Sequence, residues 1–230
     1  MSTLAVDIGG GTIKVLALAD DGSSLGARES TATPTTPTPE AVLDAIATLA
    51  RGVDSFHRLS VGFPGIVKAG VTYNAPNLGD SFWREVPLAA NLEERLGVPT
   101  RVVNDADLQG LGVIEGHGVE LVLTLGTGLG AGLFTNGHLV PNLELGHHPF
   151  RDGNTYEDLV RDSELKRVGA DEWTDRVVDA LDQIERLFSY DRLHIGGGNV
   201  RHLQRDLPAA VRFFPLEEGL RGALRLWDAL

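Results

Sequence analysis

The sequence contains no cysteine, and this absence removes several classes of site at once. Its 230 residues can form no disulfide framework, supply no thiol nucleophile and offer no thiolate ligand to a metal. Histidine is also scarce, with seven residues, so a tetrahedral zinc centre built from nitrogen ligands is not expected. The sequence therefore predicts a protein without a zinc site.

Positive charge is the second deficit. Lys and Arg total 20 against 32 Asp and Glu, which gives a formal net charge of −12. An acidic chain without a basic run binds the nucleic-acid backbone poorly. No apolar run approaches the ~18 residues needed to span a membrane, and Met1–Leu4 shows no basic-then-apolar signal pattern. We expect a cytoplasmic protein with no nucleic-acid partner and no membrane partner.

Glycine, in contrast, is abundant: 28 of the 230 residues, or about 12% against an ordinary ~7%. Three clusters, Gly9–Gly11, Gly126–Gly130 and Gly196–Gly198, each follow an apolar run typical of a strand. Because glycine has no Cβ, such turns let backbone N–H groups approach phosphate oxygens. One cluster alone is equally well explained as a structural turn, but three with the same placement predict a phosphate-binding cleft. None fits the P-loop or the dinucleotide fingerprint.

The chain reads as strands alternating with helices, which predicts the α/β class. Leu4–Ile8 and Ile13–Ala19 flank the first glycine cluster as in a β-hairpin, and Glu120–Leu125 begins a second hairpin of the same layout. Two such hairpins predict two related halves. Thr31–Pro39 is expected to be a loop. Helices are expected from Pro39 with Thr38 as its cap, over Pro87–Leu96, from Asp105 to about Glu115, over Asp171–Phe188 and over Glu217–Leu230.

Polar side chains beside the first glycine cluster suit a phosphate site. Thr12 adds a hydroxyl donor and Lys14 a positive charge, and Asp7 is expected to hold Mg²⁺ through water. The predicted phosphate-binding residues are Asp7, Gly9, Gly10, Gly11, Thr12 and Lys14 in the first cluster, Gly126, Thr127, Gly128 and Gly130 in the second, and Gly196, Gly197 and Gly198 in the third.

A carboxylate stands where the predicted strand Arg101–Val103 gives way to a helix. There Asp105 could take the proton of an attacking hydroxyl during phosphoryl transfer. The alternative is a helix N-cap, a role that Asn104 or Asp105 would satisfy equally well. Further along, Pro141–His148 places Glu144 beside two histidines. These three side chains would coordinate a metal, bind the hydroxyls of a polar ligand, or simply be exposed.

Taken in order, these segments resemble the ROK sugar kinases of the actin-like ATPase superfamily. Besides the glycine clusters, the resemblance rests on Phe63-Pro64-Gly65, Asn104-Asp105, Glu144-Leu145-Gly146-His147 and Gly219–Ala223. It extends over nearly the whole chain, and the ordered set is specific even though each piece is not.

Within that family the sequence is most similar to the polyphosphate-dependent glucokinases. The spacing of Ile13-Lys14, the run Leu139–His147 and the missing cysteine-rich zinc motif carry this likeness. The resemblance implies polyphosphate or ATP as phosphoryl donor and Mg²⁺ as cofactor. A long polyanion needs a local basic track, for which Lys14, Arg201 and Arg205 are candidates.

The resemblance also implies a two-lobed actin-like ATPase (ribonuclease H-like) fold with a cleft between the lobes. One lobe would comprise residues 1-106 plus 217-230, and the other residues 107-216. Asp105 would be the base that acts on the 6-hydroxyl of glucose or a similar hexose, and the protein would be a homodimer. The sugar would be bound by Asn77, Asn104, Asp105, Glu144, His147 and Glu157.

Two other readings stay open at this point. One is an ATP-dependent kinase of another hexose or of an amino sugar. The other is a non-catalytic ROK-like sugar-binding protein, whose relatives carry an N-terminal DNA-binding module. Because the first glycine hairpin begins at Leu4, we expect no such module, and Asp105 together with the three glycine clusters favours the enzyme.

Overall fold

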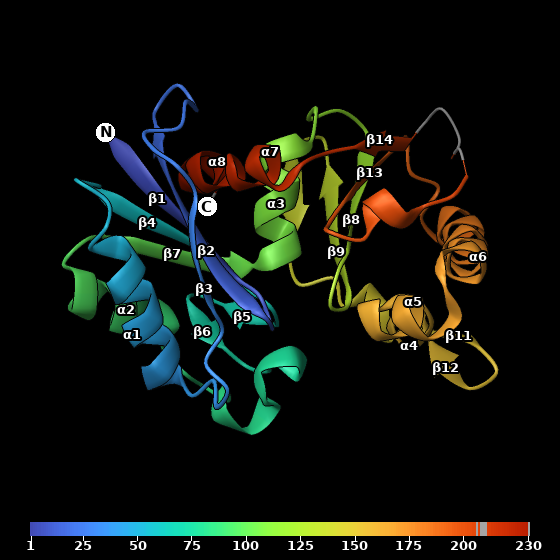
Figure 1. The fold of residues 1–230 in the computed structure, drawn as a ribbon. Coiled ribbons are helices and arrows are strands. Elements are labelled where there is room, and N and C mark those ends of the chain that lie inside the picture. Colours follow the sequence, from blue (N-terminus) through green and yellow to red (C-terminus); the bar gives the residue numbers. More distant parts are fainter. Residues whose placement is uncertain (206, 208–210, 230) are drawn as a thin grey trace.

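The computed structural model describes residues 1–205, 207 and 211–229, which form two five-stranded sheets side by side (Figure 1). The first sheet has the order β3-β2-β1-β4-β7, and the second has the order β10-β9-β8-β13-β14. The strands of the first are β1 (Ser2–Ile8), β2 (Thr12–Ala19), β3 (Glu29–Ala32), β4 (Arg58–Phe63) and β7 (Thr100–Asn104). Those of the second are β8 (Val119–Leu125), β9 (Leu129–Thr135), β10 (His138–Val140), β13 (Arg192–Gly196) and β14 (Val211–Phe213).

The two sheets repeat one topology. In each, three antiparallel strands joined by hairpins come first, and two parallel strands are then added beside the first strand. The β1–β2 turn holds the first glycine cluster and the β8–β9 turn holds the second. The predicted pair of related halves and the α/β class are therefore confirmed.

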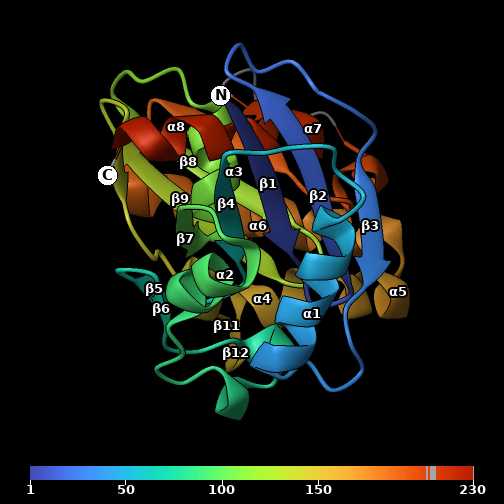
Figure 2. The ribbon, with the colours of Figure 1, turned by 90° about the vertical axis from the view of Figure 1, so that its left-hand side faces the viewer.

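Helices cover the outer face of each sheet (Figures 1 and 2). On the first sheet, α1 (Pro39–Ala50) and α2 (Leu88–Leu96) bury an apolar core with β1, β2 and β4. Thr38 caps α1 as predicted, since its hydroxyl accepts a hydrogen bond from the backbone N–H of Ala41 at 3.3 Å. On the second sheet, α4 (Tyr156–Val160), α5 (Asp162–Val168) and α6 (Ala170–Phe188) form a separate core.

A third core joins the two halves. It is built around α3 (Asp105–Val113), which follows β7 directly and lies between the sheets with α7 (Leu216–Leu220) and α8 (Gly222–Ala229). The single helix predicted over Glu217–Leu230 is wrong, because the chain breaks at Arg221 into these two helices; residue 230 lies outside the described residues. The break lets α7 and α8 each approach the backbone of α3 closely.

Other differences concern short elements that carry little periodicity. The predicted loop Thr31–Pro39 is wrong at its start, since Thr31 and Ala32 belong to the edge strand β3. There are also two small antiparallel hairpins. In one, β5 (Val67–Lys68) pairs with β6 (Val71–Thr72), and in the other, β11 (Pro149–Arg151) pairs with β12 (Asn154–Thr155). Four 3₁₀ turns lie at Pro76–Leu78, Asp80–Phe82, Leu145–His147 and Val200–His202.

The lobe boundaries at residues 106 and 217 remain a prediction. As expected for that division, α8 is tied to the first sheet, where Ser60 Oγ donates a hydrogen bond to the carbonyl of Ala223 at 2.7 Å. Across the described part of the chain, no helix combines the length and the apolar character needed to cross a membrane.

Candidate active site

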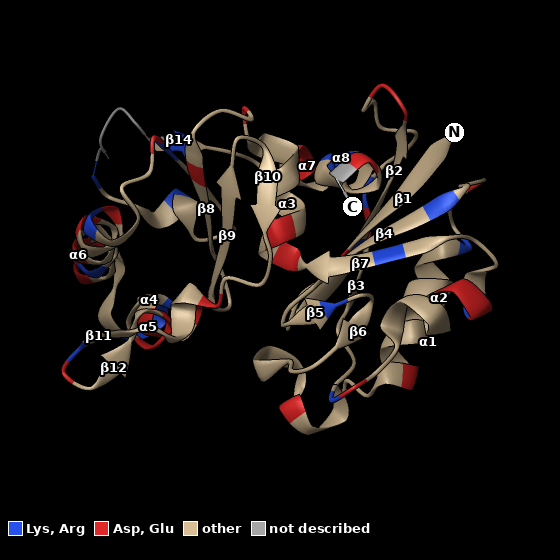
Figure 3. Cartoon of the chain, turned by 180° about the vertical axis from the view of Figure 1, so that it is seen from behind, with Lys and Arg blue, Asp and Glu red and all other residues tan. Residues whose placement is uncertain are grey.

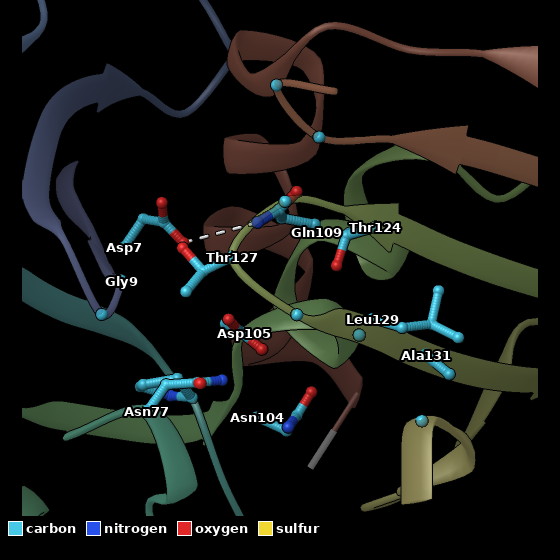
Figure 4. A pocket seen from close by; sticks show the side chains of 18 of the residues that line it. Asp7, Gly9, Asn77, Asn104, Asp105, Gln109, Thr124, Thr127, Leu129 and Ala131 are labelled. Atoms are coloured by element: carbon cyan, nitrogen blue, oxygen red, sulfur yellow. Dashed lines mark hydrogen bonds between the residues drawn. The ribbon is translucent and has the colours of Figure 1, made fainter. Parts of the chain in front are cut away.

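A cavity of about 610 Å³ lies between the two sheets and is lined by residues of both halves (Figure 4). All three glycine clusters reach it. The lining residues among those predicted to bind phosphate are Asp7, Gly9, Gly10, Lys14, Gly126, Thr127, Gly128, Gly130, Gly197 and Gly198. Gly11, Thr12 and Gly196 are their chain neighbours but do not themselves line the cavity.

The two glycine turns approach each other across the cavity. A Cβ placed on Gly10 would lie 3.0 Å from the carbonyl oxygen of Asn77 and 3.7 Å from the methyl group of Thr127. Gly197 has a φ of +97°, and its Cβ would collide with the backbone of Leu125, which leads into the second turn. Glycine is therefore required here by close backbone approach, and the three clusters surround one space.

The first hairpin supplies an ion pair at the edge of this space. Asp7 and Lys14 stand directly opposite each other in β1 and β2, and Lys14 Nζ lies 2.8 Å from Asp7 Oδ2. The other carboxylate oxygen of Asp7 accepts a long hydrogen bond, 3.4 Å, from Gln109 Nε2 of α3. Asp7 is buried, whereas Lys14 keeps 28% of its side chain exposed, so the ammonium group is accessible from the cavity.

The start of α3 shows which residue of the Asn104-Asp105 pair caps the helix. Asn104 is the N-cap, since its Oδ1 accepts hydrogen bonds from the backbone N–H groups of Ala106 and Asp107 at 2.9 and 3.2 Å. Asp105 occupies the first helical position, and its carboxylate lines the cavity (Figure 4). Because the capping role is filled by its neighbour, Asp105 is available for chemistry.

The surroundings of Asp105 make it a stronger base than an ordinary carboxylate. Burial raises the pKa of Asp105 to about 8, and the negative charges of Asp7, Glu144 and Asp107 act in the same direction against one hydrogen bond from the Ala106 N–H. Figure 3 shows acidic residues gathered at the start of α3, between the sheets. A general base is most effective when its pKa lies near the working pH, which this arrangement provides.

The second half of the cavity is polar without being basic. Glu157 Oε2 accepts a hydrogen bond from the backbone N–H of Leu129 at 3.0 Å, and His147 Nε2 lies 3.5 Å from Glu144 Oε2. Burial raises the pKa of Glu144; His147 lowers it, and the nearby Glu157 raises it. The structure thus brings together all the side chains predicted to bind a sugar: Asn77, Asn104, Asp105, Glu144, His147 and Glu157 all line the cavity.

His148 and the arginines predicted to form a basic track lie elsewhere. Arg205 pairs with Asp175 of α6 at 2.5 Å, and Arg201 donates to its neighbour His202 at 3.1 Å. Neither arginine lines the cavity, nor does His148. Within the described residues, no three His, Asp or Glu side chains gather in a way that could hold a metal ion.

Several lining residues were missed by the sequence. They are Arg28, Gln109, Thr124, Asp162, Asn199 and the stretch Phe214–Leu216. Asn199 could have been found, because it directly follows the third glycine cluster, and its Nδ2 donates to the carbonyl of Gly126 at 3.1 Å. Gln109 and Thr124 lie in a helix and a strand that the sequence predicts, but no pattern marks their side chains as facing a cleft. Arg28, Asp162 and Phe214–Leu216 come from segments without a recognisable pattern.

The loop that carries Glu144 is fixed from both halves by Asn142. The Asn142 side chain accepts from the Val67 N–H at 2.8 Å and donates to the Val67 carbonyl at 3.0 Å, while its own N–H donates to Asp107 Oδ2 at 3.0 Å. Asn142 has a φ of +61°, a conformation that asparagine tolerates better than most residues. Asp107 is almost fully buried, which raises its pKa to about 7.

Comparison with known proteins agrees with this geometry. The sequence profile of the ROK family matches residues 3–155. A polyphosphate glucokinase of Mycobacterium leprae is 33% identical over 227 residues, which cover 92% of this chain and 68% of that protein. A polyphosphate glucokinase of Mycobacterium tuberculosis is 31% identical over 218 residues, which cover 88% of this chain and 80% of that protein.

Solved structures give the same relation. The inorganic polyphosphate/ATP-glucomannokinase of Arthrobacter sp. strain KM superposes with a TM-score of 0.89 at 32% identity, over 99% of this chain and 98% of that one. A ROK family glucokinase of Streptomyces griseus, solved with glucose and AMPPNP, superposes with a TM-score of 0.77 at 23% identity. The match covers 98% of this chain and 99% of that one, and it shows that the fold is shared. The predicted fold class and the predicted resemblance are confirmed: this chain belongs to the ROK family.

Proposed function

We propose that the protein transfers a phosphoryl group from polyphosphate or ATP to the 6-hydroxyl of glucose, with Asp105 as general base. The observation that carries the proposal is the position of the Asp105 carboxylate. Asn104, not Asp105, caps α3, and the pKa of Asp105 is raised to about 8. The Asp105 carboxylate faces a cavity lined by the glycine turns and by polar groups that can bind sugar hydroxyls.

The polar half of the cavity suits a ligand that presents only hydroxyls. Glu144 and Glu157 offer carboxylate oxygens, Asn77 an amide, and His147 a ring nitrogen, and all four line the same cavity. A site of this kind discriminates well, because an analogue lacking a hydroxyl would leave a buried polar group unpaired. This supports a hexose as acceptor.

In the reaction, the oxygen of the sugar 6-hydroxyl attacks the terminal phosphorus of the donor. A carboxylate oxygen of Asp105 accepts the proton of this hydroxyl. The bond from phosphorus to the bridging oxygen breaks, and the shortened donor leaves with that oxygen. Lys14 and the backbone N–H groups of the glycine turns would balance the charge that spreads over the transferred group. Asn104 holds Asp105 in place by capping α3.

The residues present suit Mg²⁺. This ion needs only one or two protein carboxylates, because waters and the phosphates of the substrate complete its octahedron. Asp7 lies at the cleft close enough to Asp105 for the negative charge of Asp7 to raise the pKa of Asp105, so the cleft carries negative charge for a cation to neutralise. Asp7 would hold Mg²⁺ through water, and the ion would neutralise charge on the donor phosphates.

Polyphosphate is the donor that the relatives favour, since the two mycobacterial proteins are named for it and the Arthrobacter enzyme for polyphosphate and ATP. We expect glucose 6-phosphate to form with nucleotide-free polyphosphate. Raising the salt concentration should raise the KM for polyphosphate more than the KM for glucose, because ions screen a polyanion and hardly affect a neutral sugar. Turnover on ATP with none on polyphosphate would make the protein an ATP-dependent kinase.

Three further expectations accompany this function. The homodimer and the cytoplasmic location stay predictions, as does the absence of a nucleic-acid partner. The acceptor is proposed as glucose or a similar hexose, and mannose and N-acetylmannosamine belong in the same assay, because relatives are named for glucomannokinase and N-acetylmannosamine kinase activity.

A further inference from the structure

Two cations line the cavity in the described part of the chain, Lys14 and Arg28. Arg28 immediately precedes β3, whose Ser30 is paired with Lys14 of β2. Side chains two residues apart along an extended chain point to the same side. Arg28, just before the neighbouring strand, therefore lies on the face from which Lys14 reaches the cavity.

The present partner of Arg28 is Glu217, at the start of α7. The Arg28 Nη1 to Glu217 Oε1 distance is 2.5 Å, and the two side chains are 39% and 56% exposed. The residues just before Glu217, Phe214 to Leu216, line the cavity. The ion pair is thus exposed to solvent beside the cavity, and it joins the segment before β3 to the start of α7.

This ion pair is of a kind that exchanges easily. An exposed pair between single side chains contributes about 0–1 kcal/mol, because water and salt screen it. A guanidinium group binds phosphate oxygens in a bidentate manner and with greater strength. A phosphate chain reaching the mouth of the cavity would therefore compete well with Glu217 for Arg28.

We propose that Arg28 is a second cationic contact for the phosphoryl donor, on the solvent side of Lys14, and that Glu217 competes with the donor for it. The ligand is a chain of phosphates that extends beyond the group being transferred. The proposal rests on the function proposed above. It replaces the track expected from Arg201 and Arg205, which do not line the cavity.

Steady-state kinetics with polyphosphate at low ionic strength test this subsite through two substitutions of opposite expected effect. Arg28→Gln should raise the KM for polyphosphate about fivefold to tenfold and leave the KM for glucose unchanged, because one charge-assisted contact is lost. Glu217→Gln should lower the KM for polyphosphate, because Arg28 loses its competing acceptor. Arg205→Gln is the matched control, since it removes an arginine that lies off the cavity, and it should change neither constant.

The possible outcomes separate the subsite from the function. If the Arg28–Glu217 pair only braces the fold, both substitutions shift the KM in the same direction or leave it unchanged, and the subsite is overturned. If the wild-type protein turns over glucose with ATP but not with polyphosphate, the donor assignment fails and the subsite with it. If Arg205→Gln raises the KM as much as Arg28→Gln, a diffuse surface charge explains the effect.

Discussion

Replacement of Asp105 by asparagine should lower turnover by about 10²–10⁴-fold, the usual contribution of a general base. Asparagine has nearly the same shape but cannot accept the proton of the attacking hydroxyl. The fold should persist, because Asn104 and not Asp105 caps α3, and sugar binding should be retained. Steady-state turnover together with calorimetric binding of glucose checks both expectations, and a variant with near-native turnover would remove Asp105 from the mechanism.

The pH dependence gives this prediction a second readout. In the wild-type protein kcat/KM should fall as the pH falls through the raised pKa of Asp105, about 8, because the protonated carboxyl cannot act as base. The asparagine variant should lack this acid limb. Ionised Asp105 also lowers the stability of the fold, since its pKa in the folded protein, about 8, lies above the ordinary aspartate value of 3.8. The free energy of unfolding of the variant should therefore exceed that of the wild type by at least about 1.4 kcal/mol at pH 9, and the two should be equal at pH 4.

Gly222→Ala should destabilise the protein by about 3 kcal/mol, near the upper end for an overpacked contact. The added methyl group would collide with the carbonyl oxygen of Leu108 and lie 2.8 Å from the backbone nitrogen of Gly112. Both atoms belong to the backbone of α3 and cannot rotate away, so α8 must separate from α3. Since α3 carries Asp105, activity should fall together with stability.

Thermal or denaturant unfolding measures this effect, and Gly26→Ala is its matched control. Gly26 is exposed, and a Cβ placed on it meets nothing within 4 Å. Its substitution should change stability by no more than about 0.5 kcal/mol. Equal stability of the two variants would show that α8 does not need the close approach to α3.

Much of the fold follows from local patterns in the sequence. The two hairpins, α1 with its Thr38 cap, and α6 are marked by apolar periodicity and by capping or glycine residues, and all occur where the sequence predicts them. The break at Arg221 was not predictable in this way. It depends on the approach of α7 and α8 to α3, a contact between segments far apart in the chain.

The candidate site shows the same division. The glycine clusters and Asn104-Asp105 are recognisable because each follows a strand, and parallel strands of one sheet end at the same edge. That the edges of the two sheets meet at one cavity is shown only by the structure. The sequence could not identify Arg28 as a lining residue of the cavity. Its position depends on contact with Glu217, which lies 189 residues away in the chain. Asn142 depends likewise on Val67, 75 residues away.

The most direct test of the proposed function is to identify the product formed from glucose and a phosphoryl donor. Wild-type protein incubated with Mg²⁺, glucose and either polyphosphate or ATP should yield glucose 6-phosphate, with the phosphate on O6 by nuclear magnetic resonance. It should yield nothing with 6-deoxyglucose, which lacks the attacking hydroxyl. Absence of glucose 6-phosphate with both donors, or phosphorylation of 6-deoxyglucose at comparable rate, would contradict the account.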